Sequence, residues 1–372
     1  MTAPASPAVA AASVPLLSAP YDLLSWLVGL WSDALGWVGE KLGIAMLEYV
    51  FMHHAFLVGA LIAVMAPLIG TFLVHRQLAL IGDALAHTAF AGVAVGLFIN
   101  SLLGTGISPY VTAIVVAVIA ALAIELISET TDAYNDVSMA IVLSTGFALG
   151  AVLISLNTGG LAVGINQYLF GNLSTVSREN AVLLVVLFAV VALVVTVTYK
   201  QLLYVTFDET AARVAGVNVP WYNRLMTTLT ALVVVGAMQI MGVILVAAML
   251  VVPVAAAAQL ARGFREALLA SVVLAQIAVL VGITLSFRYN TTAGGTIVLV
   301  AVAVYVAAVL AGKAQSRRSG DEIPERADDA ETPEHADGAE TPEHADGAEI
   351  PERADDAETP EHADGAEQST SD

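Results

Sequence analysis

The sequence predicts an all-α, polytopic membrane protein with about nine transmembrane helices and a disordered, acidic C-terminal tail. Of the 372 residues, 58% are hydrophobic and 13% are charged, and the mean hydropathy is +0.80. Several apolar runs reach about 20 residues, the length that an α-helix needs to cross a bilayer. The chain has no cysteine, which excludes a disulfide framework and a thiolate metal site.

The N-terminal segment, residues 1–47, differs from the body of the chain. Residues 1–20 are rich in Ala, Pro and Ser and lack Lys and Arg, so we expect a loose arm rather than a signal peptide. Residues 21–47 mix aromatic and charged side chains, namely Trp26, Trp31, Trp37, Asp22, Asp33, Glu40 and Lys41. This mixture favours a helix lying in the membrane interface, because tryptophan prefers the headgroup level. An additional crossing stays open, since the length suffices.

Nine apolar runs are predicted to form a transmembrane domain over residues 48–314. They lie near residues 50–74, 83–100, 109–128, 137–156, 180–199, 225–241, 243–260, 267–287 and 296–312. The division between the sixth and the seventh depends on Gly242 alone. Loops with an excess of Lys and Arg are expected in the cytoplasm. This places residues 200–224 and the C-terminus inside, and the N-terminal arm outside.

An aspartate and a histidine stand where the second span begins. The run Leu80-Ile81-Gly82-Asp83-Ala84-Leu85-Ala86-His87 puts Asp83 and His87 four residues apart, on one face of a helix. Ionisable side chains are costly in lipid, so both should face protein or water. A carboxylate and an imidazole are also ligands for zinc or manganese. The pair therefore indicates either metal ligands or two residues that only cap and fix a helix start.

Other polar residues in the spans are further candidates. His53 and His54, near the outer end of the first span, either receive metal or are simply solvated at the membrane edge. Glu125 is expected to snorkel or to pair with a neighbouring helix. Asp136 opens the fourth span, where it serves as an N-cap or faces the pathway.

The acidic charge is concentrated in the tail, residues 315–372. Of the 33 acidic residues, 20 lie within 321–372, so the rest of the chain is almost neutral. Residues 322–366 form five tandem nine-residue units, EIPERADDA or ETPEHADGA. Such a segment cannot bury a core and should be disordered. We interpret it as a solvating tail, with weak metal buffering as the alternative.

Six short blocks follow one another along the body of the chain. They are Arg76 to His87 (RQLALIGDALAH), Asp136 to Gly150 (DVSMAIVLSTGFALG), Tyr168 to Asn172 (YLFGN), Phe207 to Gly216 (FDETAARVAG), Gly242 to Pro253 (GVILVAAMLVVP) and Gly294 to Leu299 (GGTIVL). Together they resemble the permease subunit of metal-type ABC importers (ABC-3), which take up zinc, manganese or iron. The resemblance covers about residues 48–312. Departures are Ala86 for the usual Ser, His75 within the double-basic pair, and Thr292-Ala293 for a proline-containing turn.

The resemblance implies a type II ABC importer-like permease in the plasma membrane, with a cytoplasmic tail. Its partners would be an ATP-binding subunit, an extracellular solute-binding protein, a second copy of the chain and the lipid bilayer, with no nucleic acid. The chain would be non-catalytic and would hold no permanent cofactor: a divalent metal is the substrate, and ATP binds the partner subunit. The absence of a G-x-x-x-x-G-K-[ST] loop from the sequence fits this division of labour.

The resemblance also assigns roles to particular residues. Asp83 and His87 would meet the passing metal transiently, with their copies across the dimer axis as further ligands. A cytoplasmic coupling helix would lie within 253–266 and dock into the ATPase. Its candidate residues are Pro253, Gln259, Arg262, Gly263, Phe264 and Arg265. An interfacial turn held by snorkelling arginines is the alternative.

Two other functions stay open on the sequence. A permease for metal chelates such as haem, siderophore or cobalamin shares the general architecture. An ATP-independent secondary carrier would need no partner ATPase, although such carriers usually show more paired charges deep in several spans.

Overall fold

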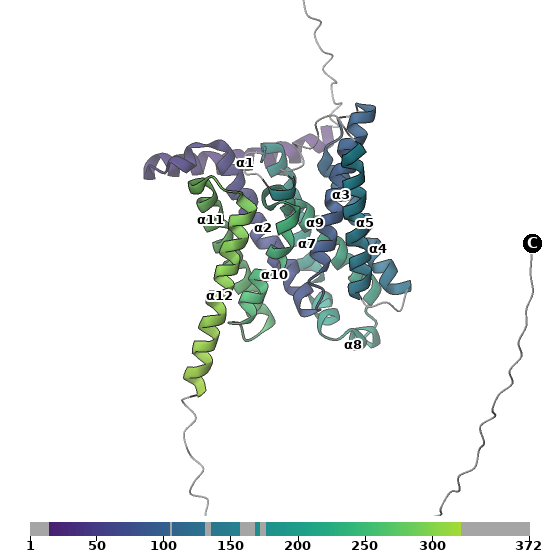
Figure 1. Cartoon of the computed structure of the whole chain (residues 1–372). Coiled ribbons are helices and arrows are strands. Elements are labelled where there is room, and N and C mark those ends of the chain that lie inside the picture. The colour runs from purple at the N-terminus through teal and green to yellow at the C-terminus, as the bar shows by residue number, and fades with distance from the viewer. Residues whose placement is uncertain (1–14, 105, 131–134, 157–167, 172–175, 321–372) are drawn as a thin grey trace, which may run out of the picture. The chain divides into compact units, whose positions relative to one another are not determined.

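The computed structural model in Figure 1 describes residues 15–104, 106–130, 135–156, 168–171 and 176–320. Regular structure in these residues is helical. The elements are α1 (Pro15–Leu42), the 3-10 turn η1 (Ala45–Glu48), α2 (Val50–His75), α3 (Ile81–Leu103), α4 (Pro109–Thr130), α5 (Asn135–Leu156), α7 (Arg178–Phe207), α8 (Glu209–Val214), α9 (Val219–Met241), α10 (Val243–Ala258), α11 (Phe264–Tyr289) and α12 (Ala293–Gly320). The predicted all-α class is confirmed. The acidic repeat lies outside the described residues.

Each of the nine predicted spans coincides with a helix, from α2 to α12 with α8 excepted. Among the described helices, seven are long and apolar enough to cross a membrane: α2, α3, α4, α5, α7, α11 and α12. Helix α10 adds a shorter apolar stretch, Leu245–Ala258. Helix α9 begins six residues before the predicted span and carries polar residues in its first turns. These first turns lie at the end of the bundle that carries α8, where Arg76 contacts both helices.

The break between α9 and α10 falls at Gly242, as predicted. Its φ of 77° and ψ of 159° end α9 and begin α10. A side chain at this position would meet the backbone, because an added Cβ would lie 2.2 Å from the carbonyl oxygen of Leu169. Glycine is therefore required here both for its positive φ and for the close approach of residues 168–171.

Helix α1 runs across one end of the bundle, and α8 lies at the opposite end (Figure 1). The prediction of a loose arm over residues 1–20 is wrong for residues 15–20, because α1 begins at Pro15. Proline is tolerated at this first position because its missing N–H would have no intrahelical partner. Helix α1 is not among the helices with the hydropathy of a membrane span.

Helix α3 is held between α4 and α5 by glycines that allow close backbone contact. Toward α4, a Cβ added at Gly92 would lie 2.6 Å from the Cα of Ala113. Toward α3, a Cβ added at Gly146 of α5 would lie 2.9 Å from the Cα of Thr88. Small residues permit such approaches in membranes, where helices associate by packing rather than by exclusion from water. This packing fixes the helix that carries Asp83 and His87.

Candidate functional site

Asp83 and His87 lie in the first turns of α3, on one face, as the sequence predicts. The Oδ1 of Asp83 and the Nε2 of His87 are 3.7 Å apart, and their side chains are 39% and 21% exposed. This separation exceeds a hydrogen bond, so the two side chains lie close together without being hydrogen-bonded to each other. Asp83 is not the residue that caps α3, because Leu80 occupies the N-cap position.

Helix α5 covers one side of this pair. The ring of Phe147 stacks edge-on against the imidazole of His87, with ring centroids 5.5 Å apart. Next to it, Gly146 contacts Thr88, the residue that follows His87. Among the described residues, the buried Nδ1 of His87 has no hydrogen-bond partner. The imidazole is thus oriented by packing, and a ring nitrogen is left without a competing protein bond.

One chain supplies only part of a metal coordination shell. Within the described ranges, no group of three or more His, Cys, Asp or Glu side chains is placed to hold a metal ion. Structural zinc sites use four protein ligands. Two ligands per chain are therefore suited to a transient contact rather than to a permanent site.

His53 and His54 lie in the first turn of α2, far from this pair. Their exposed fractions are 4% and 7%, so the expectation of solvated histidines is wrong. The Nδ1 of His53 lies 2.8 Å from the Oγ of Ser32, and its Nε2 lies 2.7 Å from the carbonyl oxygen of Leu47. Because both ring nitrogens have protein partners, His53 holds α1 and η1 on α2 and has no nitrogen free for a metal.

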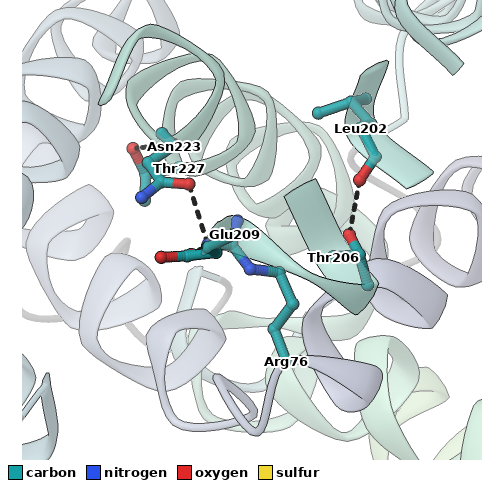
Figure 2. A network of polar contacts seen from close by, with 6 residues as sticks. All are labelled: Arg76, Leu202, Thr206, Glu209, Asn223 and Thr227. Atoms are coloured by element: carbon teal, nitrogen blue, oxygen red, sulfur yellow. Dashed lines mark hydrogen bonds and ion pairs between the residues drawn. The ribbon is translucent and has the colours of Figure 1, made fainter. Parts of the chain in front are cut away.

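The end of the bundle that carries α8 contains a polar network that the sequence pattern does not predict. Arg76, just after α2, forms an ion pair with Glu209 of α8. The same guanidinium nitrogen donates to Asn223 Oδ1 of α9 at 2.8 Å. Figure 2 shows these three side chains together with Thr227, whose hydroxyl donates to the Asn223 carbonyl at 3.2 Å. Arg76 therefore joins three elements at the turn that leads into α3.

A cavity of about 190 Å³ lies beside this network. Glu125, Glu129, Glu209, Arg76 and Asn223 contribute polar groups to its wall, and Ile81 from the start of α3 adds an apolar contact. Glu125 of α4 and Asn223 of α9 line the same cavity, a position that is compatible with the predicted pairing between neighbouring helices. Asp136 is exposed at the start of α5, on a shallow surface apart from this cavity.

Replacing Arg76 with alanine is expected to lower the stability of the protein by about 1–2 kcal/mol. The side chain of Arg76 is 9% exposed but that of Glu209 is 45% exposed, so water screens part of the interaction. Arg76→Lys should recover part of the loss. Thermal unfolding in detergent measures the effect, with Arg213→Ala, an exposed arginine of α8, as the control. Equal melting temperatures for Arg76→Ala and the unchanged protein would contradict this prediction.

The predicted coupling helix over residues 253–266 is wrong in its local structure. Helix α10 ends at Ala258, Gln259 is its C-cap, and α11 begins at Phe264 after the N-cap Gly263. Pro253 is buried inside α10. The residues from Gln259 to Gly263 form the turn between the two helices, so no separate helix exists there.

Phe264 faces the bundle rather than a partner. Its ring lies 5.1 Å from the rings of both Phe72 and His75, and 5.7 Å from that of Phe207. Aromatic contacts of this kind stabilise packing between helices. Of the proposed coupling residues, those left exposed at this turn are Gln259, Arg262, Gly263 and Arg265.

The apolar helices, with polar groups buried between them, define a multi-pass membrane protein. The chain belongs to the ABC 3 transport family, whose family model matches residues 48–312. This confirms the resemblance inferred from the six sequence blocks, over the range expected for it.

Individual relatives agree with this assignment. The chain is 33% identical over 259 residues to a probable metal transport system membrane protein of Treponema pallidum, covering 70% of this chain and 94% of that one. It is 33% identical over 263 residues to the manganese transport system membrane protein MntC of Halalkalibacterium halodurans, covering 71% and 88%. A chain in the structure of PsaBC from Streptococcus pneumoniae in complex with Fab matches with a TM-score of 0.64 and 29% identity, covering 73% and 95%.

Proposed function

We propose that this chain is the permease subunit of an ATP-driven importer of divalent metal ions. The observation that carries the proposal is the Asp83–His87 pair, held on one face of α3 by the packing of α4 and α5. The relatives named for metal or manganese transport support a divalent metal as the substrate. Manganese is the first ion to test, and zinc and iron are the others that a carboxylate and an imidazole suit.

In this function the pair acts as a transient contact on the pathway. A transported ion must bind strongly enough to enter and weakly enough to leave. The carboxylate of Asp83 attracts the cation, and the imidazole of His87 supplies a nitrogen ligand. A second copy of the chain would bring an equivalent pair, so the pathway would lie between two permeases. No resident cofactor is required for this step.

The energy would come from a separate ATP-binding subunit, which makes this chain a non-catalytic component. The exposed turn with Gln259, Arg262 and Arg265 is the surface that we assign to the ATPase. An extracellular solute-binding protein would deliver the metal at the α1 end. This arrangement puts the protein in the plasma membrane with α8 and the C-terminal tail on the cytoplasmic side, in agreement with the distribution of Lys and Arg.

The proposed function is tested with the permease co-reconstituted with its ATPase in liposomes. We expect ATP-dependent uptake of manganese and stimulation of ATP hydrolysis by the metal-loaded binding protein. Uptake without ATP would instead identify a secondary carrier. Uptake of a haem or siderophore complex without competition from free manganese or zinc would identify a chelate importer.

Deleting residues 319–372 is expected to leave manganese uptake largely unchanged. The repeat carries most of the acidic residues and, apart from Ile323 and Ile350, no large apolar ones, so we expect it to contribute nothing to the packed bundle. Initial uptake rates of the shortened and full chains, at equal amounts of assembled complex, measure this. A large loss of uptake would show that the repeats buffer metal for transport.

A further inference from the structure

Helix α1 lies outside residues 48–312, the range of the family match, and the proposed transport step does not use it. We propose that α1 is a membrane-interface anchor: a stripe of large apolar residues along it binds the boundary between lipid headgroups and acyl chains. The stripe consists of Leu23, Trp26, Leu27, Leu30 and Trp37, each between 45% and 62% exposed.

A different side of α1 faces the bundle. The residues on this side are small and recur every three or four positions: Ser25, Gly29, Ser32, Gly36 and Gly39. Ser32 meets His53 at 2.8 Å, and the carbonyl of Ser25 accepts from Arg178 at 2.5 Å. Near the C-terminus of α1, an added Cβ at Gly39 would lie 2.6 Å from the Cβ of Leu47. The helix is therefore fixed to α2, α7 and η1, with its rotation about its own axis defined.

The fixed rotation leaves the apolar stripe about half exposed, on a side of α1 that does not face the bundle. With about 100° per residue, the apolar stripe lies roughly opposite the small residues. Trp31 lies outside the stripe, and its indole N–H donates to the carbonyl of His53 at 3.1 Å, which fixes the rotation of α1 further. A contiguous apolar patch of this kind marks a surface that contacts lipid or another protein, because exposing it to water is unfavourable.

The acidic residues of α1 indicate that this contact is with lipid. Asp22, Asp33 and Glu40 are all exposed and share one side of the helix, separate from the centre of the apolar stripe. Separate acidic and apolar sides are the pattern of a helix lying at a membrane surface. The Nζ of Lys41 lies 5.9 Å from the Trp37 ring centre, a position from which its ammonium can reach the headgroups.

The location of α1 also indicates that lipid contacts its apolar stripe. The membrane-length helix α2 starts at Val50, directly after η1, and α1 crosses the same end of the bundle (Figure 1). A helix in this place lies at headgroup level, where tryptophan is favoured. Because acids outnumber bases in α1, anionic lipids gain no attraction from it. The binding should therefore depend on apolar contact and be insensitive to salt.

Tryptophan quenching tests this inference, because the chain has only four tryptophans. Variants that keep Trp26 alone or Trp37 alone, with the other three changed to Phe, are reconstituted as single copies in phosphatidylcholine nanodiscs. We expect a spin label near the headgroup to quench each about twofold more than a label deep in the acyl chain, since interfacial helices sink only about 5–10 Å. High salt should not change the quenching.

A matched control comes from the acidic side of the same helix. In a chain with all four tryptophans replaced, Glu40→Trp should be quenched by aqueous iodide and much less by either lipid label. Iodide quenching of Trp26 and Trp37 without lipid quenching would overturn the proposal. Protection of both from iodide and from lipid labels would also overturn it, since a second copy or another protein would then cover the stripe.

His53→Ala is a second variant for the anchor. Loss of the two contacts of His53 should free the rotation of α1, so that lipid quenching of Trp37 falls and iodide quenching of Trp37 rises. His53→Asn, which retains hydrogen-bonding groups, should restore part of the difference. These readouts do not depend on transport, so they remain informative whether or not metal uptake is found.

Discussion

Replacing Asp83 or His87 by alanine is expected to abolish metal uptake by the assembled complex. Each substitution removes one of the two ligand groups that face each other across 3.7 Å on α3. Within the part of the chain that the structure describes, neither residue forms a side-chain hydrogen bond to another helix, and neither caps α3, so folding should survive. Uptake of radioactive manganese into proteoliposomes, at equal amounts of assembled permease and ATPase, measures the effect.

The conservative variants separate ligation from packing. Asp83→Asn keeps the shape but loses the charge, and should be almost as inactive as the alanine variant. His87→Phe keeps the ring stacking on Phe147 but loses both nitrogens, and should also be inactive. Asp33→Ala, an exposed acid of α1, is the control and should transport normally. Normal uptake by both alanine variants would remove these residues from the pathway.

Replacing Gly146 with leucine is also expected to abolish metal uptake. The cause is different, because this substitution displaces α3 and removes no ligand group. A Cβ at this position would lie 2.5 Å from the Cγ2 and 3.0 Å from the backbone nitrogen of Thr88. Backbone atoms cannot move aside as a side chain can, so α3 and α5 must separate. Overpacking in a closely packed core costs about 1–3 kcal/mol, and occasionally more. We expect a lower melting temperature together with the loss of transport.

A graded series makes this second prediction specific. Gly146→Ala adds only the first carbon and should give an intermediate loss of stability. Ala307→Leu adds a similar amount of apolar surface at an exposed position of α12. It should change neither the melting temperature nor metal uptake. An unchanged melting temperature for Gly146→Leu would show that α3 and α5 are not closely packed at this level.

Local patterns predicted much of this structure. Continuous apolar runs identified nine helices, seven of which are long and apolar enough to cross a membrane, because a helix that meets lipid on most sides is apolar on most sides. The spacing of Asp83 and His87 predicted their common face because four residues make about one helical turn. Gly242 predicted the break between α9 and α10 because its conformation is unfavourable for other residues.

Contacts between distant parts of the chain were not predictable in the same way. Arg76 and its partners Glu209 and Asn223 are separated by 133 and 147 residues, and no local pattern reports such a pairing. His53 was interpreted as a membrane-edge residue, whereas contacts with α1 bury it. Phe264 was assigned to a partner surface, whereas two helices, α2 and α7, provide its aromatic contacts.

Helix α2 is tied at both of its ends, by His53 to α1 and through Arg76 to α8 and α9. Between that anchored helix and α3 lies a short turn in which Gln77 has a φ of 60°, while α3 itself packs on α4 and α5. Because α3 also packs on α9 and α10, this turn joins two helices that are both held by the rest of the bundle. The starting position of α3, and with it the placement of Asp83 and His87, is therefore set by the same contacts that hold α2 at its two ends.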